Sequence, residues 1–316
     1  MLLEDTQAVV ETGSVCDGCL GRCFADRGIG LTNPERGSAL RICTAMVVDE
    51  PLDRVDPNGC WVCAGLAPDF AGWADRVAAA LVDIGFETFQ LGTRVPDAVT
   101  AREADLRTEV GLDPDAGDSL NAECNREVGR RLESRLGAVV DFDYPDVVAI
   151  MDLEGGRVDL QFNPAYLSGR YWKHSTGIPQ RIRICRGCNG QGTQWREGEA
   201  QPCEACNGSG YDTKESVEWY IAEPIRDELA GSDAVFNAAG HEDEDELVLG
   251  SGRPFVIEIK EPHRRPADVA ALADAIAGAS QEVVTVDGLA PADRGIVECL
   301  TQTTVRQTYR LTVKFS

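Results

Sequence analysis

Eight of the twelve cysteines form four CxxC pairs, a spacing that lets both thiolates of a pair bind one metal ion. Two such pairs complete a tetrahedral zinc site, in which no ligand position is open to a substrate. The last two pairs are separated by only 14 residues, and each continues as CxxCxGxG. The pattern therefore predicts one or two structural zinc ions, bound by Cys16, Cys19, Cys60 and Cys63 and by Cys185, Cys188, Cys203 and Cys206.

Disulfides and free core thiols are the alternatives for these cysteines. Metal binding is favoured because disulfides are rare in reducing compartments. The first group has the weaker signal, since 40 residues separate its pairs and Cys23 and Cys43 compete as ligands. We expect Cys124 and Cys299 to be ordinary buried thiols. The CxxCxGxG repeats are also similar to the zinc region of DnaJ-type chaperones, but only over residues 185–210.

The 316 residues include 53 acidic and 30 basic ones, and the formal net charge is -23. Such a charge argues against nucleic acid binding, but only four of the basic residues are lysines. A uniformly acidic, lysine-poor chain resembles proteins of salt-loving archaea, in which molar salt screens the repulsion. The net charge therefore indicates that the protein works in concentrated salt, and it does not indicate which ligand the protein binds. No apolar run approaches about 18 residues, and the N-terminus has no basic signal, so we expect a cytoplasmic protein that contacts no membrane.

Residues 160–195 contain no Asp or Glu, where the chain average predicts about six. This window instead combines arginines with aromatic side chains, which suits contact with an RNA backbone and stacking on its bases. It therefore predicts an RNA contact through Arg170, Lys173, Arg181 and Arg183, interleaved with Tyr166, Tyr171, Trp172 and Trp195. The alternative is a domain interface from which packing excludes acid.

An acidic run, Gly-His-Glu-Asp-Glu-Asp-Glu at residues 240–246, directly precedes Gly250, Gly252 and an apolar segment. In so acidic a chain, such a run is ordinarily a solvated loop. Its place before a predicted strand also suits a carboxylate at a sheet edge beside a cleft.

The chain resembles the THUMP-containing tRNA pseudouridine synthases of archaea and eukaryotes over essentially its whole length. The similarity rests on several long, non-repetitive segments and on the second group of CxxC pairs. These segments are CDGCLGR (16–22), FQLGTRV (89–95), NREVG (125–129), GRYWKH (169–174), IPQ (178–180), SVE (216–218) and GRPFVIEI (252–259). The acidic composition fits a haloarchaeal member. The resemblance implies an isomerase that makes pseudouridine at positions 54/55 in the T arm of tRNA, without a redox or group-transfer cofactor.

The resemblance also implies roles for particular residues. The family's catalytic aspartate lies in Gly-Arg-Glu-Asp, which maps to Asp243, and a carboxylate there acts beside C1′ of a flipped uridine. A family tyrosine that packs on the flipped base matches Tyr309. We also assign Arg253, within the 252–259 match, to substrate binding. The chain departs from the family where His241 replaces the arginine of that motif, and Glu244 adds a charge beside Asp243.

The sequence ends at Ser316, before a third family motif, so we expect a fragment or a C-terminally short member of the family. Two alternatives to the enzyme follow from these departures. One is a non-catalytic tRNA-binding paralog, and the other is a zinc-ribbon chaperone or interaction module. In each case we expect a monomer.

Periodicity predicts an α+β protein, and the resemblance implies three domains. These are an N-terminal zinc module of irregular structure (1–67), a THUMP-like RNA-binding domain (68–180), and a zinc-ribbon island followed by a partial pseudouridine-synthase-like mixed or antiparallel sheet (181–316). Helices are expected at 70–84, 120–136, from about 214 with an interruption or a kink at Pro224, and at 266–279. Strands are expected at 86–91, 146–153, 157–162, 246–249, 254–260, 282–286 and 304–315.

Overall fold

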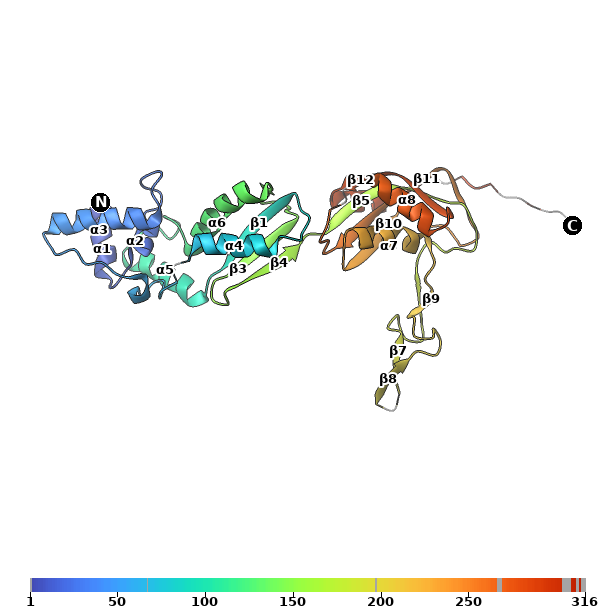
Figure 1. Ribbon diagram of the computed structural model, residues 1–316, viewed down its shortest axis with the longest axis horizontal. Coiled ribbons are helices and arrows are strands. Elements are labelled where there is room, and N and C mark those ends of the chain that lie inside the picture. The colour runs from blue at the N-terminus through green and yellow to red at the C-terminus, as the bar shows by residue number, and fades with distance from the viewer. Residues whose placement is uncertain are drawn as a thin grey trace. The chain divides into compact units, whose positions relative to one another are not determined.

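The computed structural model describes residues 2–66, 68–196, 198–265, 269–302, 308–310 and 313. The chain divides into two compact units, Met1–Asp83 with Glu87–Gln161 and Ile84–Phe86 with Phe162–Ser316. Each unit contains helices and strands, as the α+β prediction requires (Figure 1). Within the described ranges, no helix is both long enough and apolar enough to cross a membrane.

The segment 1–67 is largely helical, so the prediction of irregular structure was wrong. It contains α1 (Leu2–Glu11), α2 (Asp17–Cys23) and α3 (Asn33–Val48). α3 begins with a capping box between Thr32 and Glu35. The glycines that suggested loops instead let α2 and α3 touch, since a Cβ on Gly21 or Gly37 would lie 1.8 Å from a backbone oxygen of the other helix.

The rest of the first unit contains a four-stranded sheet in the order β2-β1-β3-β4, in which β1 is parallel to β2 and β3. Its strands are β1 (Thr88–Arg94), β2 (Val139–Val140), β3 (Val147–Asp152) and β4 (Arg157–Phe162). Its helices are α4 (Phe70–Ala80), α5 (Asp97–Glu109) and α6 (Leu120–Leu136). The predicted ends of α6 are confirmed, because Ser119 Oγ accepts a hydrogen bond from the Ala122 N–H and Gly137 has φ +65°. α4 ends four residues before its predicted end.

The second unit is built on an antiparallel sheet in the order β10-β11-β5-β12. Its strands are β5 (Ala165–Lys173), β10 (Asp233–Ala238), β11 (Val248–Lys260) and β12 (Val284–Ala292). Helices α7 (Val217–Glu228) and α8 (Val269–Ala279) cover one face, where Leu167 and Tyr171 of β5 are buried with Ile221 and Ile276 (Figure 1). A third helix, α9 (Gly295–Gln302), contacts β10 and β11.

Two strands of this sheet, β5 and β10, were not predicted. β5 lies between β11 and β12, and its alternate residues Leu167, Tyr171 and Lys173 are buried. The alternation was hidden because Lys173, a charged residue, occupies a core position. The predicted strands 246–249 and 254–260 are one strand, β11, whose pairing shifts between Val248 and Arg253.

Other predictions in this unit were met only in part. α7 continues through Pro224 rather than breaking there, because Ile221 and Ile225 anchor it in the core on both sides of the proline. The predicted strand 304–315 lies mostly outside the described residues.

The island between Arg181 and Ser216 holds two short antiparallel sheets, β6 (Arg183–Ile184) with β9 (Tyr211–Thr213) and β7 (Thr193–Arg196) with β8 (Glu199–Pro202).

Candidate active site and metal centres

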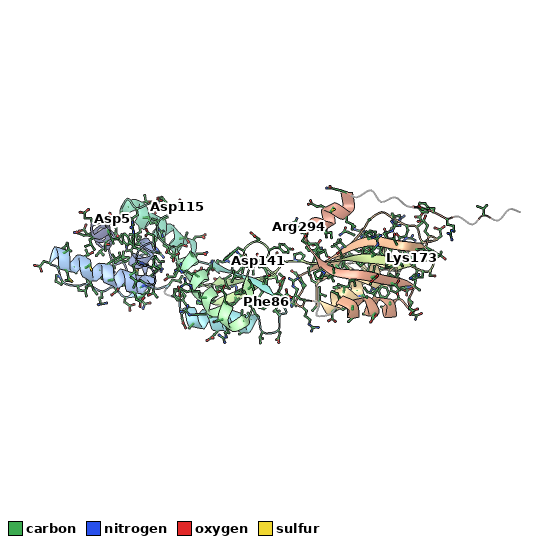
Figure 2. All side chains as sticks on the ribbon, turned by 90° about the horizontal axis from the view of Figure 1, so that it is seen from above. Asp5, Phe86, Asp115, Asp141, Lys173 and Arg294 are labelled. Atoms are coloured by element: carbon green, nitrogen blue, oxygen red, sulfur yellow. The ribbon has the colours of Figure 1, made fainter. Side chains whose placement is uncertain are left out.

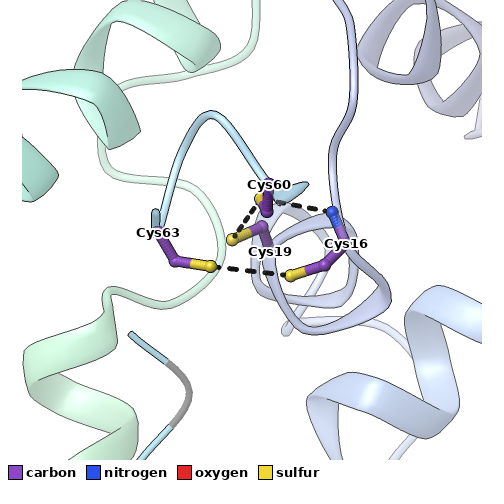
Figure 3. A group of neighbouring side chains, drawn as sticks. All are labelled: Cys16, Cys19, Cys60 and Cys63. Carbon is purple, nitrogen blue, oxygen red and sulfur yellow. Dashed lines mark hydrogen bonds between the residues drawn. The ribbon is translucent and has the colours of Figure 1, made fainter. Parts of the chain in front are cut away.

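The first four predicted ligands converge at the start of α2 and in the turn after a short 3-10 helix, Pro57–Gly59 (Figure 3). The Sγ atoms of Cys16 and Cys63 lie 3.8 Å apart, and those of Cys19 and Cys60 lie 3.5 Å apart. All four sulfurs are buried and lie within 4.8 Å of one another. A tetrahedral zinc ion with bonds of about 2.3 Å would hold its sulfurs about 3.8 Å apart. The site therefore fits a tetrahedral metal ion.

Hydrogen-bond donors surround these sulfurs. The Cys16 backbone N–H lies 3.3 Å from Cys60 Sγ, and Arg22 Nη2 donates to Cys19 Sγ at 2.9 Å. Hydrogen bonds from Cys16 and Cys19 lower the pKa of Cys63 to about 7. Donors of this kind compensate part of the negative charge that four thiolates would bring to one ion.

The second four ligands form a matching group in the island between α7 and β5. The Sγ–Sγ distances are 4.0 Å for Cys185 and Cys203 and 3.7 Å for Cys188 and Cys206. The last glycine of each CxxCxGxG repeat donates its N–H to the second cysteine of that repeat at 3.2 Å. The repeats also exchange backbone hydrogen bonds, from the Cys185 N–H to Gly210 and from the Cys203 N–H to Gly192, each 2.8 Å long. The glycine spacing thus aims amides at sulfur, as a metal knuckle requires.

The alternatives for the cysteines can now be compared with the fold. All twelve lie within the described ranges, and none of them forms a disulfide. Cys23 is buried but donates to the Cys19 carbonyl, and Cys43 is exposed, so neither competes for the first site. Cys124 is buried as predicted. Cys299 is exposed, so the prediction that it is buried was wrong.

We expect the purified protein to contain two equivalents of bound metal, one for each group of four cysteines. Cys60→Ser and Cys203→Ser should each remove one equivalent, because a hydroxyl is a far weaker ligand than a thiolate for a soft site. Cys43→Ser is the matched control and should remove none. Elemental mass spectrometry measures the number of metal ions bound per protein chain. Less than one equivalent in the parent protein would contradict both sites.

The acidic run lies in the loop between β10 and β11, and its side chains differ in exposure. The side chains of His241 and Asp243 are 67% and 75% exposed, whereas that of Glu242 between them is 1% exposed. His241 Nε2 lies 3.7 Å from Asp243 Oδ1. The loop therefore presents the Asp243 carboxylate to solvent, where it can meet a substrate. For Glu242, the alternative of a merely solvated loop is wrong.

Glu242 is the residue of this site that sequence reasoning missed. Its carboxylate lies 2.7 Å from the Tyr171 hydroxyl, 2.8 Å from Gln180 Nε2 and 2.8 Å from Arg253 Nε. An acidic residue among other acidic residues gives no signal of burial by itself. The IPQ and GRYWKH segments that supply Gln180 and Tyr171 were found, but only the fold shows that they meet Glu242.

Two of the residues predicted to contact the substrate are buried and donate hydrogen bonds to carbonyls of the protein itself. Lys173 lies at the end of β5 (Figure 2), is 0% exposed, and its Nζ donates to the carbonyls of Ile178 at 2.7 Å and Asp243 at 2.8 Å. Burial lowers the pKa of Lys173, and nearby carboxylates, led by Glu242, oppose that shift. Arg253 is 8% exposed and donates to the Ala239 carbonyl. Their contact with substrate stays a prediction, but these contacts hold the loop.

The other predicted contacts are more accessible. The side chains of Arg181 and Arg183 are 46% and 54% exposed, and Arg183 pairs with Glu244 of the Asp243 loop at 2.8 Å. Arg170 donates to the carbonyls of Ser251 and Gly252 in the bulged part of β11. The fold therefore brings Arg183 to the loop that carries Asp243, and Arg170 to the strand that follows this loop.

Tyr309 lies in the short described segment 308–310 and is 59% exposed. An exposed aromatic ring can stack on a base. That Tyr309 stacks on a flipped uridine stays a prediction.

Comparison with known proteins assigns both units to one family. Residues 73–152 match the family model of the archaeal Pus10 THUMP domain, and residues 166–316 match the Pus10 C-terminal model. The chain is 44% identical over 314 residues to the tRNA pseudouridine synthase Pus10 of Halorubrum lacusprofundi, a match that covers 99% of this chain and 73% of that protein. It is 33% identical over 340 residues to the protein of the same name from Methanothrix thermoacetophila, covering 100% of this chain and 73% of that protein. With these matches added to the motifs and the cysteine sites, the chain belongs to the Pus10 family of tRNA pseudouridine synthases.

Proposed function

We propose that this chain converts uridine to pseudouridine at positions 54/55 in the T arm of tRNA, with Asp243 as its catalytic residue. The observation that carries the proposal is the exposed Asp243 carboxylate on a loop whose backbone is held by buried groups. The relatives from Halorubrum and Methanothrix are named tRNA pseudouridine synthase, which supports the same reaction here.

The chemistry needs an anionic group beside the sugar. The bond between N1 of uracil and C1′ breaks, and a bond between C5 and C1′ forms in the same nucleotide. The C5 proton leaves to solvent, and N1 takes up a proton in its place. A carboxylate at Asp243 can attack C1′ or stabilise the positive charge that develops on the sugar. The uridine must first leave its stack to reach such a loop. Because the product is an isomer of the substrate, the reaction itself calls for no redox or group-transfer cofactor.

We propose that the antiparallel sheet β10-β11-β5-β12 is the pseudouridine-synthase sheet of the family. Because β5 pairs with β11 and β12, this catalytic part would begin near Phe162, which moves the boundary predicted after residue 180. The zinc module and the THUMP-like domain would then form the first unit. Both cysteine groups would hold structural zinc, which closes their turns without contacting substrate, since four thiolates fill the coordination sphere.

The tRNA contacts proposed for the second unit are the exposed arginines Arg181 and Arg183, with Arg170 beside the bulge of β11. Arginines near the Asp243 loop would bind the phosphates that flank a flipped nucleotide. Tyr309 would stack on the base. We propose that the protein acts as a cytoplasmic monomer.

One observation favours a second candidate, a non-catalytic tRNA-binding member of the family. His241 stands 3.7 Å from Asp243, where the family motif has an arginine. An arginine pairs with the carboxylate at every pH, whereas a histidine pairs with it fully only when protonated. In this chain, the electrostatic attraction that positions the Asp243 carboxylate is therefore weaker than an arginine would provide.

A tritium-release assay separates the two candidates. Unmodified tRNA labelled at C5 of uridine is incubated with the full chain at molar salt, and released tritium is measured. We expect release, and we expect none from tRNA whose uridines at positions 54/55 are replaced by cytidine. Tight binding of the labelled tRNA without release would contradict the enzyme and support the binding protein.

A further inference from the structure

We propose that Glu242 is a positioning residue for Asp243, which sets the place of the catalytic carboxylate without touching the substrate. This inference rests on the proposed function of Asp243. The Glu242 side chain is 1% exposed, so no substrate can reach it in this fold. It nevertheless precedes Asp243 directly in the chain, and any shift of its backbone moves Asp243.

The carboxylate of Glu242 is held from three elements. Tyr171 on β5 places its hydroxyl 2.7 Å from both carboxylate oxygens. Gln180, in the segment after β5, donates to Oε2 at 2.8 Å, and Arg253 on β11 places Nε 2.8 Å from the same oxygen. A group held from three directions has little freedom to move.

The groups that hold Glu242 also hold the backbone beside it. Arg253 donates to the carbonyls of Ala239 at 2.8 Å and His241 at 3.3 Å. Gln180 Nε2 donates to the Gly240 carbonyl at 3.1 Å, and its Oε1 lies 2.9 Å from His241 Nδ1. Glu242 is thus the centre of a network that fixes the loop on the N-terminal side of Asp243.

Lys173 fixes the other side of the loop. Its Nζ donates to the Asp243 carbonyl at 2.8 Å and lies 3.4 Å from the Glu244 carbonyl. Lys173 and Arg253 are both buried cations, and Glu242 is a buried anion that pairs with Arg253 at 2.8 Å. Glu242 also leads the nearby carboxylates that favour the charged form of Lys173. The negative charge of Glu242, and not only its shape, is therefore required to keep both anchors in place.

The test is Glu242→Gln, which keeps the shape of the side chain and removes its charge. We expect kcat for tritium release to fall about 10- to 100-fold, because small displacements of a catalytic group have large effects. The dissociation constant for tRNA should stay unchanged, since Glu242 does not reach the surface. Asp245→Asn is the matched control, because it removes one charge from an exposed position of the same loop. It should leave kcat unchanged and strengthen tRNA binding no more than slightly.

A second variant covers the case in which Glu242→Gln does not fold. Tyr171→Phe keeps the buried ring and removes one hydrogen bond to Glu242, and it should lower kcat by a smaller factor with tRNA binding intact. Unchanged kcat in a folded Glu242→Gln protein would overturn the positioning role, as would a loss that appears only in tRNA affinity. Failure of the proposed function would look different, because the parent protein would then bind tRNA without tritium release, or Asp243→Asn would keep the release of the parent.

Discussion

Replacing Asp243 by asparagine is expected to lower pseudouridine formation by at least about a thousandfold, which is typical for loss of a group that acts on the reacting bond. Asparagine has nearly the same size as aspartate but can neither attack C1′ as an anion nor stabilise a cationic sugar. Tritium release from labelled tRNA at molar salt measures the effect.

The same variant should keep its fold and its affinity for tRNA. The Asp243 side chain is 75% exposed, and surface substitutions change the free energy of unfolding by less than about 0.5 kcal/mol. Removing one anion near a polyanionic ligand should, if anything, strengthen tRNA binding slightly. Asp245→Asn is the charge-matched control in the same loop. Release by Asp243→Asn at the parent rate would exclude Asp243 as the catalytic residue.

The second large effect concerns Arg22, which joins the first cysteine site to the helices of the same unit. Arg22 is 5% exposed and donates to Cys19 Sγ at 2.9 Å. It also pairs with Glu103 of α5 at 3.2 Å and with Glu123 of α6 at 2.9 Å, and both carboxylates are buried. One arginine thus contacts two buried carboxylates and a sulfur of the first cysteine group.

Arg22→Met should lower the free energy of unfolding of the first unit by about 3–5 kcal/mol, because it leaves buried carboxylates without their partner. Hydrogen exchange of the α5 and α6 amides measures the loss in this unit alone. Arg130→Met is the control on α6, where an arginine that is 68% exposed pairs with Glu127. This surface pair should contribute less than about 1 kcal/mol. Equal protection in the two variants would exclude the proposed role of Arg22.

The effect of Arg22→Met should also depend on pH. Burial raises the pKa of Glu103 above its ordinary value, against the opposing effects of Arg22 and Arg107. Loss of Arg22 raises that pKa further, so the folded variant binds a proton more readily than the unfolded chain. The stability of the variant therefore increases as the pH falls through this raised pKa. We expect the deficit relative to the parent to shrink toward acidic pH and to be largest at neutral pH.

The parts of the fold that were predicted correctly depend on neighbours in the sequence. α6 was found because its cap, Ser119, and its stop, Gly137, act within one turn of the helix. The helices of residues 1–67 were missed because this segment was expected to be irregular, and glycines such as Gly21 and Gly37 disfavour a helix by themselves. Their real role is contact between two helices, which requires knowledge of the partner helix.

The sequence by itself indicated the two groups of four cysteines, because the CxxC spacing is local, and the family, because long segments match it. The aspartate proposed as catalytic followed from that resemblance. Only the tertiary structure decided which charged residues are buried. Tyr171 and Glu242 are 71 positions apart, and Arg22 and Glu103 are 81 apart. Whether a charge lies in solvent or in the core depends on partners brought together from such distances, and the desolvation that makes these pairs important exists only in the folded chain.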